Sequence, residues 1–218
     1  MDYARILSIM EEEGRKHNAP IFAKEEVVQG EPFRILVFTM LSARSRDSRT
    51  MEVCRSLFRE ADTPRGILSL GQDKVSEILH PIGFYKGKTK RLLGLCEKLL
   101  SDFGGKVPSA LEELTTLPGV GRKTANIILA RVFGQKTIAV DVHVHRISNR
   151  LGWVKTKKPL DTEKRLMKLL PDKAIPQANR AMVSYGQTVC LPRNPKCAEC
   201  RIREYCQRIG LPKSIGLR

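Results

Sequence analysis

Apolar side chains recur every three or four residues along most of this chain, a spacing typical of amphipathic helices. Segments 51–61 and 92–103 both follow it, so each is expected to form a helix with one buried face. Gly104 and Gly105 follow the second segment and should end its helix. No segment sustains the two-residue alternation of a half-buried strand. The sequence therefore predicts an all-α fold.

Three further signals concern single helices. Segment 33–41 (FRILVFTML) is apolar on all sides, which suits a buried strand or the central helix of a bundle, and its helical neighbours favour the helix. Thr63 followed by Pro64 has the pattern of an N-cap with proline at the first helical position. Ser109 and Glu112 have the spacing of a capping box. We therefore expect one helix to start at Thr63 and another at Ser109.

Positive charge dominates the chain, with 39 Lys and Arg against 23 Asp and Glu and a formal charge of +16. Segment 142–160 holds five basic residues and no acidic one, and segment 190–218 holds seven basic and two acidic residues. Such an excess most often binds polyanions, although a basic surface kept for solubility gives the same composition. No apolar run approaches the roughly 18 residues of a membrane span, and the N-terminus lacks the pattern of a signal peptide. We expect a cytoplasmic protein without a membrane partner.

Six cysteines fall into two groups. Cys54 and Cys96 lie on the apolar faces of the two amphipathic segments, where a thiol behaves as a small buried hydrophobe. The other four have the spacing C-x6-C-x2-C-x5-C, at Cys190, Cys197, Cys200 and Cys206. Disulfides are disfavoured in a reducing compartment. Four thiolates on so short a loop instead predict a metal site, either one zinc ion or an iron–sulfur cluster.

The decapeptide LPGVGRKTAN, from Leu117 to Asn126, predicts a tight turn between two helices, the second of which runs over 122–133. Two glycines let the main chain turn sharply and leave amides at a helix N-terminus, which is a ready site for anions. A turn of this kind binds DNA phosphate without reading base sequence. We therefore expect DNA contacts from Gly119, Val120, Gly121 and Arg122.

Lys123 lies in the first turn of that helix, where the helix dipole disfavours a cation. One interpretation is a lysine that helps to hold phosphate. The other is an amine whose pKa is lowered by the dipole, by Arg122 and by partial burial, so that it acts as a nucleophile. The extended run 134–140 is long enough to bring the chain back, so we expect Asp141 near Lys123 as its partner acid. Asp141 also precedes a helical pattern and is expected to be its N-cap.

The decapeptide, the stretch IAVDVHVHRISNR over 138–150 and the cysteine spacing together resemble the endonuclease III family of DNA repair glycosylases, within the helix-hairpin-helix glycosylase superfamily. The likeness runs from about Phe33 to Cys206. It implies a two-lobed fold with a six-helix barrel domain at 25–135 and an iron–sulfur cluster domain made of 1–24 and 136–218. It also implies that the four cysteines of 190–206 ligate a four-iron four-sulfur cluster.

The same resemblance implies roles for single residues. Lys123 matches the catalytic lysine that attacks C1′ of the flipped nucleotide and forms a Schiff base, and Asp141 matches the aspartate that assists base departure. Phe84 matches a loop residue that wedges into the base stack. Arg44 stands where many relatives carry a glutamine that faces the orphaned base. His143 matches a histidine near the pocket.

The resemblance also implies a reaction. The expected enzyme removes oxidised pyrimidines from duplex DNA and nicks 3′ to the abasic site by β-elimination. Lys196 and Arg201, in the basic stretch 193–203, should contact phosphates of a duplex that holds a damaged base or an abasic site. We expect a monomer, associated with the nucleoid. The alternatives are a mismatch uracil or thymine glycosylase, an adenine glycosylase, and a non-catalytic DNA-binding protein whose cluster senses redox state.

Overall fold

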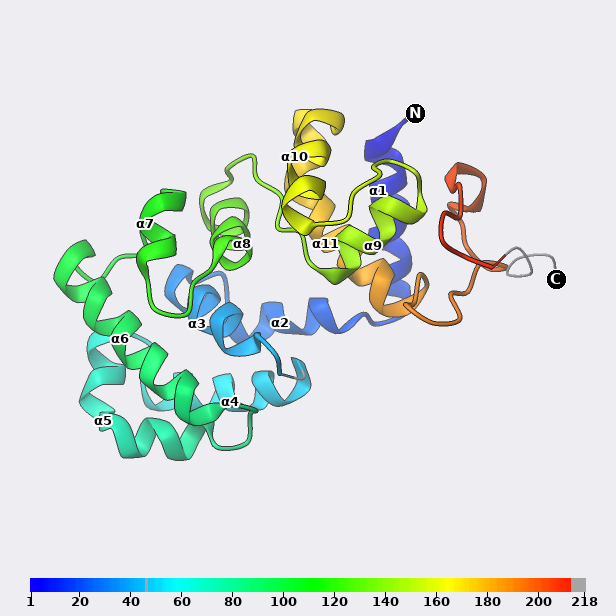
Figure 1. The fold of residues 1–218 in the computed structure, drawn as a ribbon. Helices are drawn as coiled ribbons and strands as arrows, with labels where there is room; N and C mark the ends of the chain where they lie inside the picture. The colour runs from blue at the N-terminus through cyan, green and yellow to red at the C-terminus, as the bar shows by residue number, and fades with distance from the viewer. Residues whose placement is uncertain (46, 213–218) are drawn as a thin grey trace. The chain divides into compact units, whose positions relative to one another are not determined.

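The computed structural model describes residues 1–45 and 47–212, and all regular structure in these residues is helical (Figure 1). The predicted all-α class is therefore confirmed. The chain divides into two units. Ala23–Gly134 forms the central unit, and Met1–Phe22 joins the described residues that follow Gly134 to form the terminal unit. Within the described chain, no helix is long and apolar enough to cross a membrane.

Among the described residues, seven helices lie wholly or partly in the central unit. They are α2 (Pro20–Val28), α3 (Pro32–Ser42), α4 (Asp47–Glu60), α5 (Pro64–Leu79), α6 (Tyr85–Phe103), α7 (Leu111–Thr116) and α8 (Arg122–Phe133). Helix α3 is the predicted all-apolar helix, and it packs against both α4 and α8. Cys54 of α4 and Cys96 of α6 are fully buried in the same core, as expected. Burial raises the pKa of Cys96 to about 12, so this thiol stays protonated and acts as a hydrophobe.

Several helix ends follow from local sequence. The side chain of Thr63 accepts the N–H of Gly66 at 3.1 Å, which confirms the predicted cap of α5. Gly104 and Gly134 end α6 and α8 in the left-handed conformation. The capping box predicted at Ser109 is wrong, because α7 starts at Leu111 and its N-cap is Ala110. The later start places two acidic residues in the first turn, where the helix dipole favours them.

The terminal unit is built from both ends of the described chain. Its elements are α1 (Tyr3–Lys16), α9 (Val142–Arg150), α10 (Pro159–Leu169), α11 (Ile175–Thr188) and the short 3-10 turns η1 (Asp172–Ala174) and η2 (Arg203–Tyr205). Helix α1 packs along α11 (Figure 1). The two helices approach closely at Gly14, where an added Cβ would overlap the side chain of Ser184. An ion pair between Arg180 and Glu11, at 3.0 Å, also joins them.

Candidate functional site

The hairpin joins α7 to α8 through a turn that requires glycine at Gly119. This residue has a φ of 83°, and a Cβ there would lie 3.0 Å from Cγ of Met40 and 3.3 Å from Cδ of Arg91. The N–H of Val120 donates to the carbonyl of Leu117 at 3.0 Å. The side chain of Val120 is buried, so it anchors the turn from within. The tight turn predicted from the decapeptide is present.

Helix α8 begins directly after this turn. Gly121 is its N-cap and contributes no side-chain hydrogen bond to the first turn. Main-chain amides at such an N-terminus, with the positive end of the dipole, attract anions. Arg122 and Lys123 are both exposed. The partial burial expected of Lys123 is therefore wrong, because the buried face of α8 begins further along, at Ala125.

Arg44 and Phe84 both occupy turns in the left-handed region of backbone space. The φ angle is 55° at Arg44, just beyond the end of α3, and 60° at Phe84, the N-cap of α6. Such angles strain a residue that has a side chain, and strained residues cluster at functional sites. Both side chains are exposed, and Phe84 is 70% exposed. The central unit therefore presents a cation and an aromatic ring on two strained turns.

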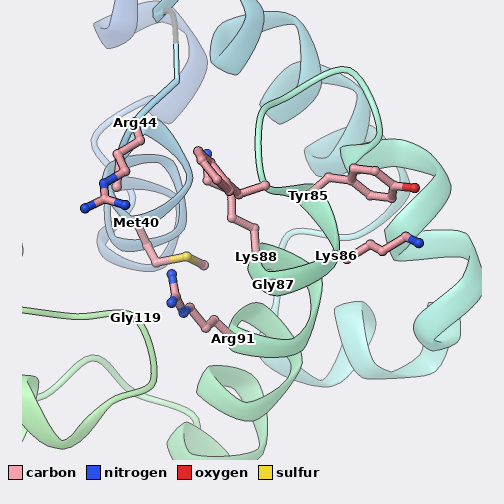
Figure 2. A pocket seen from close by; sticks show the side chains of 10 residues that line it. Met40, Arg44, Tyr85, Lys86, Gly87, Lys88, Arg91 and Gly119 are labelled. Atoms are coloured by element: carbon pink, nitrogen blue, oxygen red, sulfur yellow. The ribbon is translucent and has the colours of Figure 1, made fainter.

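Arg44, Phe84 and Gly119 line one pocket of the central unit. Figure 2 labels Arg44 and Gly119 at this pocket. Lys88 and Arg91 of α6 line it as well, and sequence reasoning missed both. In Figure 2, Arg91 reaches from α6 toward the α3 side of the pocket. The sequence did carry a signal for these two residues, because positions 84, 88 and 91 have the spacing of side chains on one face of a helix. Among the described residues no carboxylate lines this pocket, so its polar lining suits an anionic or acceptor-rich ligand.

Asp141 is the N-cap of α9, as predicted. Its Oδ1 accepts the main-chain N–H groups of His143 and Val144, both at 2.9 Å. Val142, which directly follows Asp141, is 72% exposed. His143 is half-buried, and its Nδ1 lies 3.2 Å from Nη2 of Arg146. The first turn of α9 therefore carries a fixed carboxylate, an exposed apolar side chain and an imidazole.

The four cysteines of 190–206 line one pocket of the terminal unit. Burial raises the pKa of Cys197, Cys200 and Cys206, so thiolates here need a positively charged partner. In the described chain, no three His, Cys, Asp or Glu side chains lie close enough together to hold a metal ion between them. The four thiols instead share the wall of one pocket, an arrangement that suits a group with several metal atoms, each bound to one thiolate.

Hydrogen-bond donors lie beside these sulfurs. Nη1 of Arg150 donates to Sγ of Cys190 at 3.3 Å, and the hydroxyl of Tyr185 lies 3.1 Å from Sγ of Cys200. A main-chain N–H also donates to Sγ of Cys206 at 3.4 Å. Donors of this kind stabilise the thiolate, which is the form that binds iron. The residues present therefore fit an iron–sulfur cluster.

Two basic residues of the cysteine loop differ in what they contact. The side chain of Lys196 is exposed. Nη1 of Arg201 lies 3.2 Å from Oε2 of Glu12 and 3.3 Å from Oε1 of Glu13, both on α1. Hydrogen bonds to Glu13 and Glu12 raise the pKa of Arg201. Arg201 therefore ties the loop to α1, and sequence reasoning missed this contact because the partners lie near the other end of the chain.

Two family models match the chain. The HhH-GPD superfamily base excision DNA repair protein matches residues 37–172, and the iron-sulfur binding domain of endonuclease III matches residues 190–206. The second match begins at Cys190 and ends at Cys206. The chain is therefore a four-iron four-sulfur protein. This agrees with the four cysteine thiols that line one pocket.

Whole-chain comparisons lead to the same family. Endonuclease III of Thermotoga maritima is 44% identical over 81% of this chain and 83% of its own length, and that of Rickettsia felis is 38% identical over 87% and 89%. A solved non-covalent endonuclease III–DNA complex is 34% identical, covers 81% of this chain and 83% of that chain, and has a TM-score of 0.76. A thermostable thymine-DNA glycosylase, at 24% identity and a TM-score of 0.73, over 81% of this chain and 83% of that chain, shares the fold. This chain belongs to the endonuclease III family of base excision DNA repair enzymes.

Proposed function

We propose that this chain is a bifunctional DNA glycosylase and AP lyase that removes oxidised pyrimidines from duplex DNA and nicks 3′ to the abasic site. Lys123 carries the proposal, because it is an exposed amine in the first turn of α8, beside a turn suited to phosphate. A relative that is 34% identical, with a TM-score of 0.76, covering 81% of this chain and 84% of that chain, has been solved as a trapped endonuclease III–DNA covalent intermediate. A lysine amine is a nucleophile that forms such a covalent link.

The proposed reaction uses one amine for two bond cleavages. The amine of Lys123 attacks C1′, the base leaves with a proton, and C1′ is held as an iminium. The iminium acidifies C2′, and loss of a proton from C2′ expels the 3′ phosphate. Hydrolysis of the imine then returns the amine. An activated water would stop at the abasic site, so the nick distinguishes the two mechanisms.

We assign two roles to Asp141. It stabilises the positive charge that develops on the sugar, and it transfers protons at the departing base. The bonds from His143 and Val144 to Oδ1 fix the carboxylate and leave Oδ2 for chemistry. Lys123 lies in the central unit and Asp141 in the terminal unit.

Extrusion of a base leaves a hole in the stack. We assign Phe84 to fill that hole and Arg44 to face the base that stays behind. Their exposure on strained turns beside one pocket supports both assignments. The proposed phosphate and backbone contacts come from Gly119, Val120, Gly121, Arg122, His143, Lys196 and Arg201.

The two units take different tasks in this proposal. The central unit serves as the six-helix barrel domain, and the terminal unit serves as the iron–sulfur domain. The cluster would be held by Cys190, Cys197, Cys200 and Cys206, and when bound it supplies iron–thiolate bonds that cross-link the loop. We propose that the protein binds damaged duplex DNA as a monomer at the nucleoid, in the cytoplasm.

A panel of duplexes tests the proposed function. Each duplex carries one oxidised pyrimidine, one abasic site or one mismatched uracil or thymine. We expect strand cleavage with a β-elimination end on the first two, together with a covalent protein–DNA complex in borohydride, which reduces the imine. Base release without cleavage or trapping would indicate a mismatch glycosylase. Binding without base release would indicate the non-catalytic, redox-sensing alternative.

A further inference from the structure

Lys88 is a charged residue in the buried interior beside the pocket. It lies near the start of α6 and is only 3% exposed. Its Nζ donates to the main-chain carbonyl of Leu41 at 2.7 Å and to the hydroxyl of Ser45 at 2.6 Å. The titratable groups of the described chain that face it are Cys54 and Arg91, and neither is a carboxylate.

Among the side chains that the structure describes, no acidic partner offsets this burial, so the ammonium group is a poor source of stability. Desolvation lowers the pKa of Lys88, and the nearby Arg91 lowers it further. An apolar side chain of similar length would occupy the site at less cost. The ammonium group instead positions its neighbours, because its two short hydrogen bonds fix the places of two acceptors.

Those acceptors belong to the turn that carries Arg44. Leu41 lies in the last turn of α3, and Ser45 directly follows Arg44. Lys88 itself belongs to the turn that carries Phe84, because its main-chain N–H donates to the carbonyl of Phe84 at 3.0 Å. One side chain therefore joins the two strained turns of the pocket.

The two turns also meet through their main chains. A Cβ added to Gly83 would lie 3.7 Å from the carbonyl oxygen of Arg44, which is an ordinary contact distance. Figure 2 shows Arg44 on the α3 side of the hollow and Lys88 on the α6 side. The positive φ angles of Arg44 and Phe84 persist only if the surroundings hold them. The bonds from Lys88 supply that support across the pocket.

We propose that Lys88 is a positioning residue for base extrusion, which holds the Arg44 turn against the Phe84 turn so that both side chains enter the base stack as one rigid unit. This inference rests on the proposed function and deepens it, because it identifies what keeps the two side chains in register. A displacement of about 1 Å in a positioned group is enough to slow a reaction by up to about a hundredfold.

The variant Lys88→Met tests the proposal, because methionine keeps the length of the side chain and removes its donors. Lys90→Met is the matched control, since Lys90 is exposed on the same helix and lies outside the pocket. We expect Lys88→Met to keep its Tm and to release an oxidised pyrimidine at least roughly tenfold more slowly in single turnovers. Nicking of a preformed abasic site should slow much less, because no base has to leave the stack. Lys90→Met should match wild type on both substrates.

A double variant distinguishes positioning from a general structural role. If Lys88 acts through Arg44 and Phe84, then Lys88→Met combined with Arg44→Ala should slow base release by less than the product of the two single losses. Losses that multiply would overturn the proposal. A rate for Lys88→Met equal to that of Lys90→Met would overturn it as well.

Ser45→Ala decides the question if Lys88→Met does not fold. This change removes one acceptor of Lys88 from a surface turn and leaves the core intact. We expect the same pattern with a smaller, several-fold loss of base release, and a rate equal to wild type would contradict the positioning role. Failure of the proposed function would be distinguishable from failure of the positioning role alone. In that case the wild-type protein itself would release no base, and the positioning role would be refuted as well.

Discussion

Oδ1 of Asp141 accepts the main-chain N–H of Val144 at 2.9 Å, so the residue proposed for catalysis also caps α9. Asparagine caps a helix about as well as aspartate. We therefore expect Asp141→Asn to keep the Tm of the wild type. Base release should slow severely, because a neutral amide does not stabilise a developing positive charge. Single-turnover assays on a lesion duplex measure this loss.

A preformed abasic site provides the control for this variant. No base remains to depart there, so cleavage by Asp141→Asn should suffer less than base release does. Asp141→Ala removes the cap as well and should lose about 1 kcal/mol of stability. Equal losses of Asp141→Asn on both substrates would contradict a specific role of the carboxylate in base departure.

Lys123→Gln should abolish both strand cleavage and the borohydride-trapped complex, because the amine is the proposed nucleophile. Lesion binding should persist, since the phosphate contacts lie elsewhere in the hairpin. Gel shifts and trapping gels measure the two effects separately. Lys106→Gln, another exposed lysine of the central unit, should behave as wild type. A trapped imine in Lys123→Gln would place the nucleophile on a different amine.

Local sequence predicted much of the fold because helix periodicity and caps depend on near neighbours. The cap at Thr63 and the end at Gly134 are of this kind. The failed prediction at Ser109 has a related cause, since adjacent starts differ little in energy and Leu111 places acidic residues in the first turn. The buried cysteines of the core also followed from periodicity alone.

The candidate site depended more on tertiary packing. The family resemblance indicated Arg44 and Phe84, but nothing local predicted that both would adopt left-handed backbones. Lys88 was missed because lysine is ordinarily exposed and its partner Ser45 lies 43 residues away. The pairing of Arg201 with α1 was missed for the same reason.

We expect the purified protein to be brown and to contain four iron and four sulfide per chain. Cys200→Ser should lose iron and lower the Tm, because it removes a proposed ligand beside Tyr185. Iron and sulfide analysis together with thermal melts measure both effects. Cys96→Ala is the matched control, since this buried thiol lies far outside 190–206 and its loss should leave the iron content unchanged. Colourless protein with stoichiometric zinc would contradict the assignment.

Gly14→Ala should destabilise the terminal unit. Its Cβ would overlap the side chain of Ser184, where α1 and α11 approach each other. Overpacking of this kind costs about 1–3 kcal/mol. Gly87→Ala is the matched control, because a Cβ at Gly87 meets nothing within 4 Å. A Tm for Gly14→Ala as high as that of Gly87→Ala would show that the helices move apart without cost.

Salt dependence tests the proposed phosphate contacts of the cysteine loop. Affinity for duplex DNA should fall steeply between about 50 and 200 mM salt, because each neutralised phosphate releases counterions. Lys196 is exposed, so Lys196→Ala should weaken binding to lesion and undamaged duplex alike and reduce the salt slope by about one. Arg201 must exchange its bonds to Glu12 and Glu13 for phosphate, so Arg201→Ala should reduce the slope by less.

Fluorescence anisotropy titrations measure both slopes. A flat salt response would contradict phosphate binding, and a loss confined to the lesion duplex would instead assign Lys196 to base recognition.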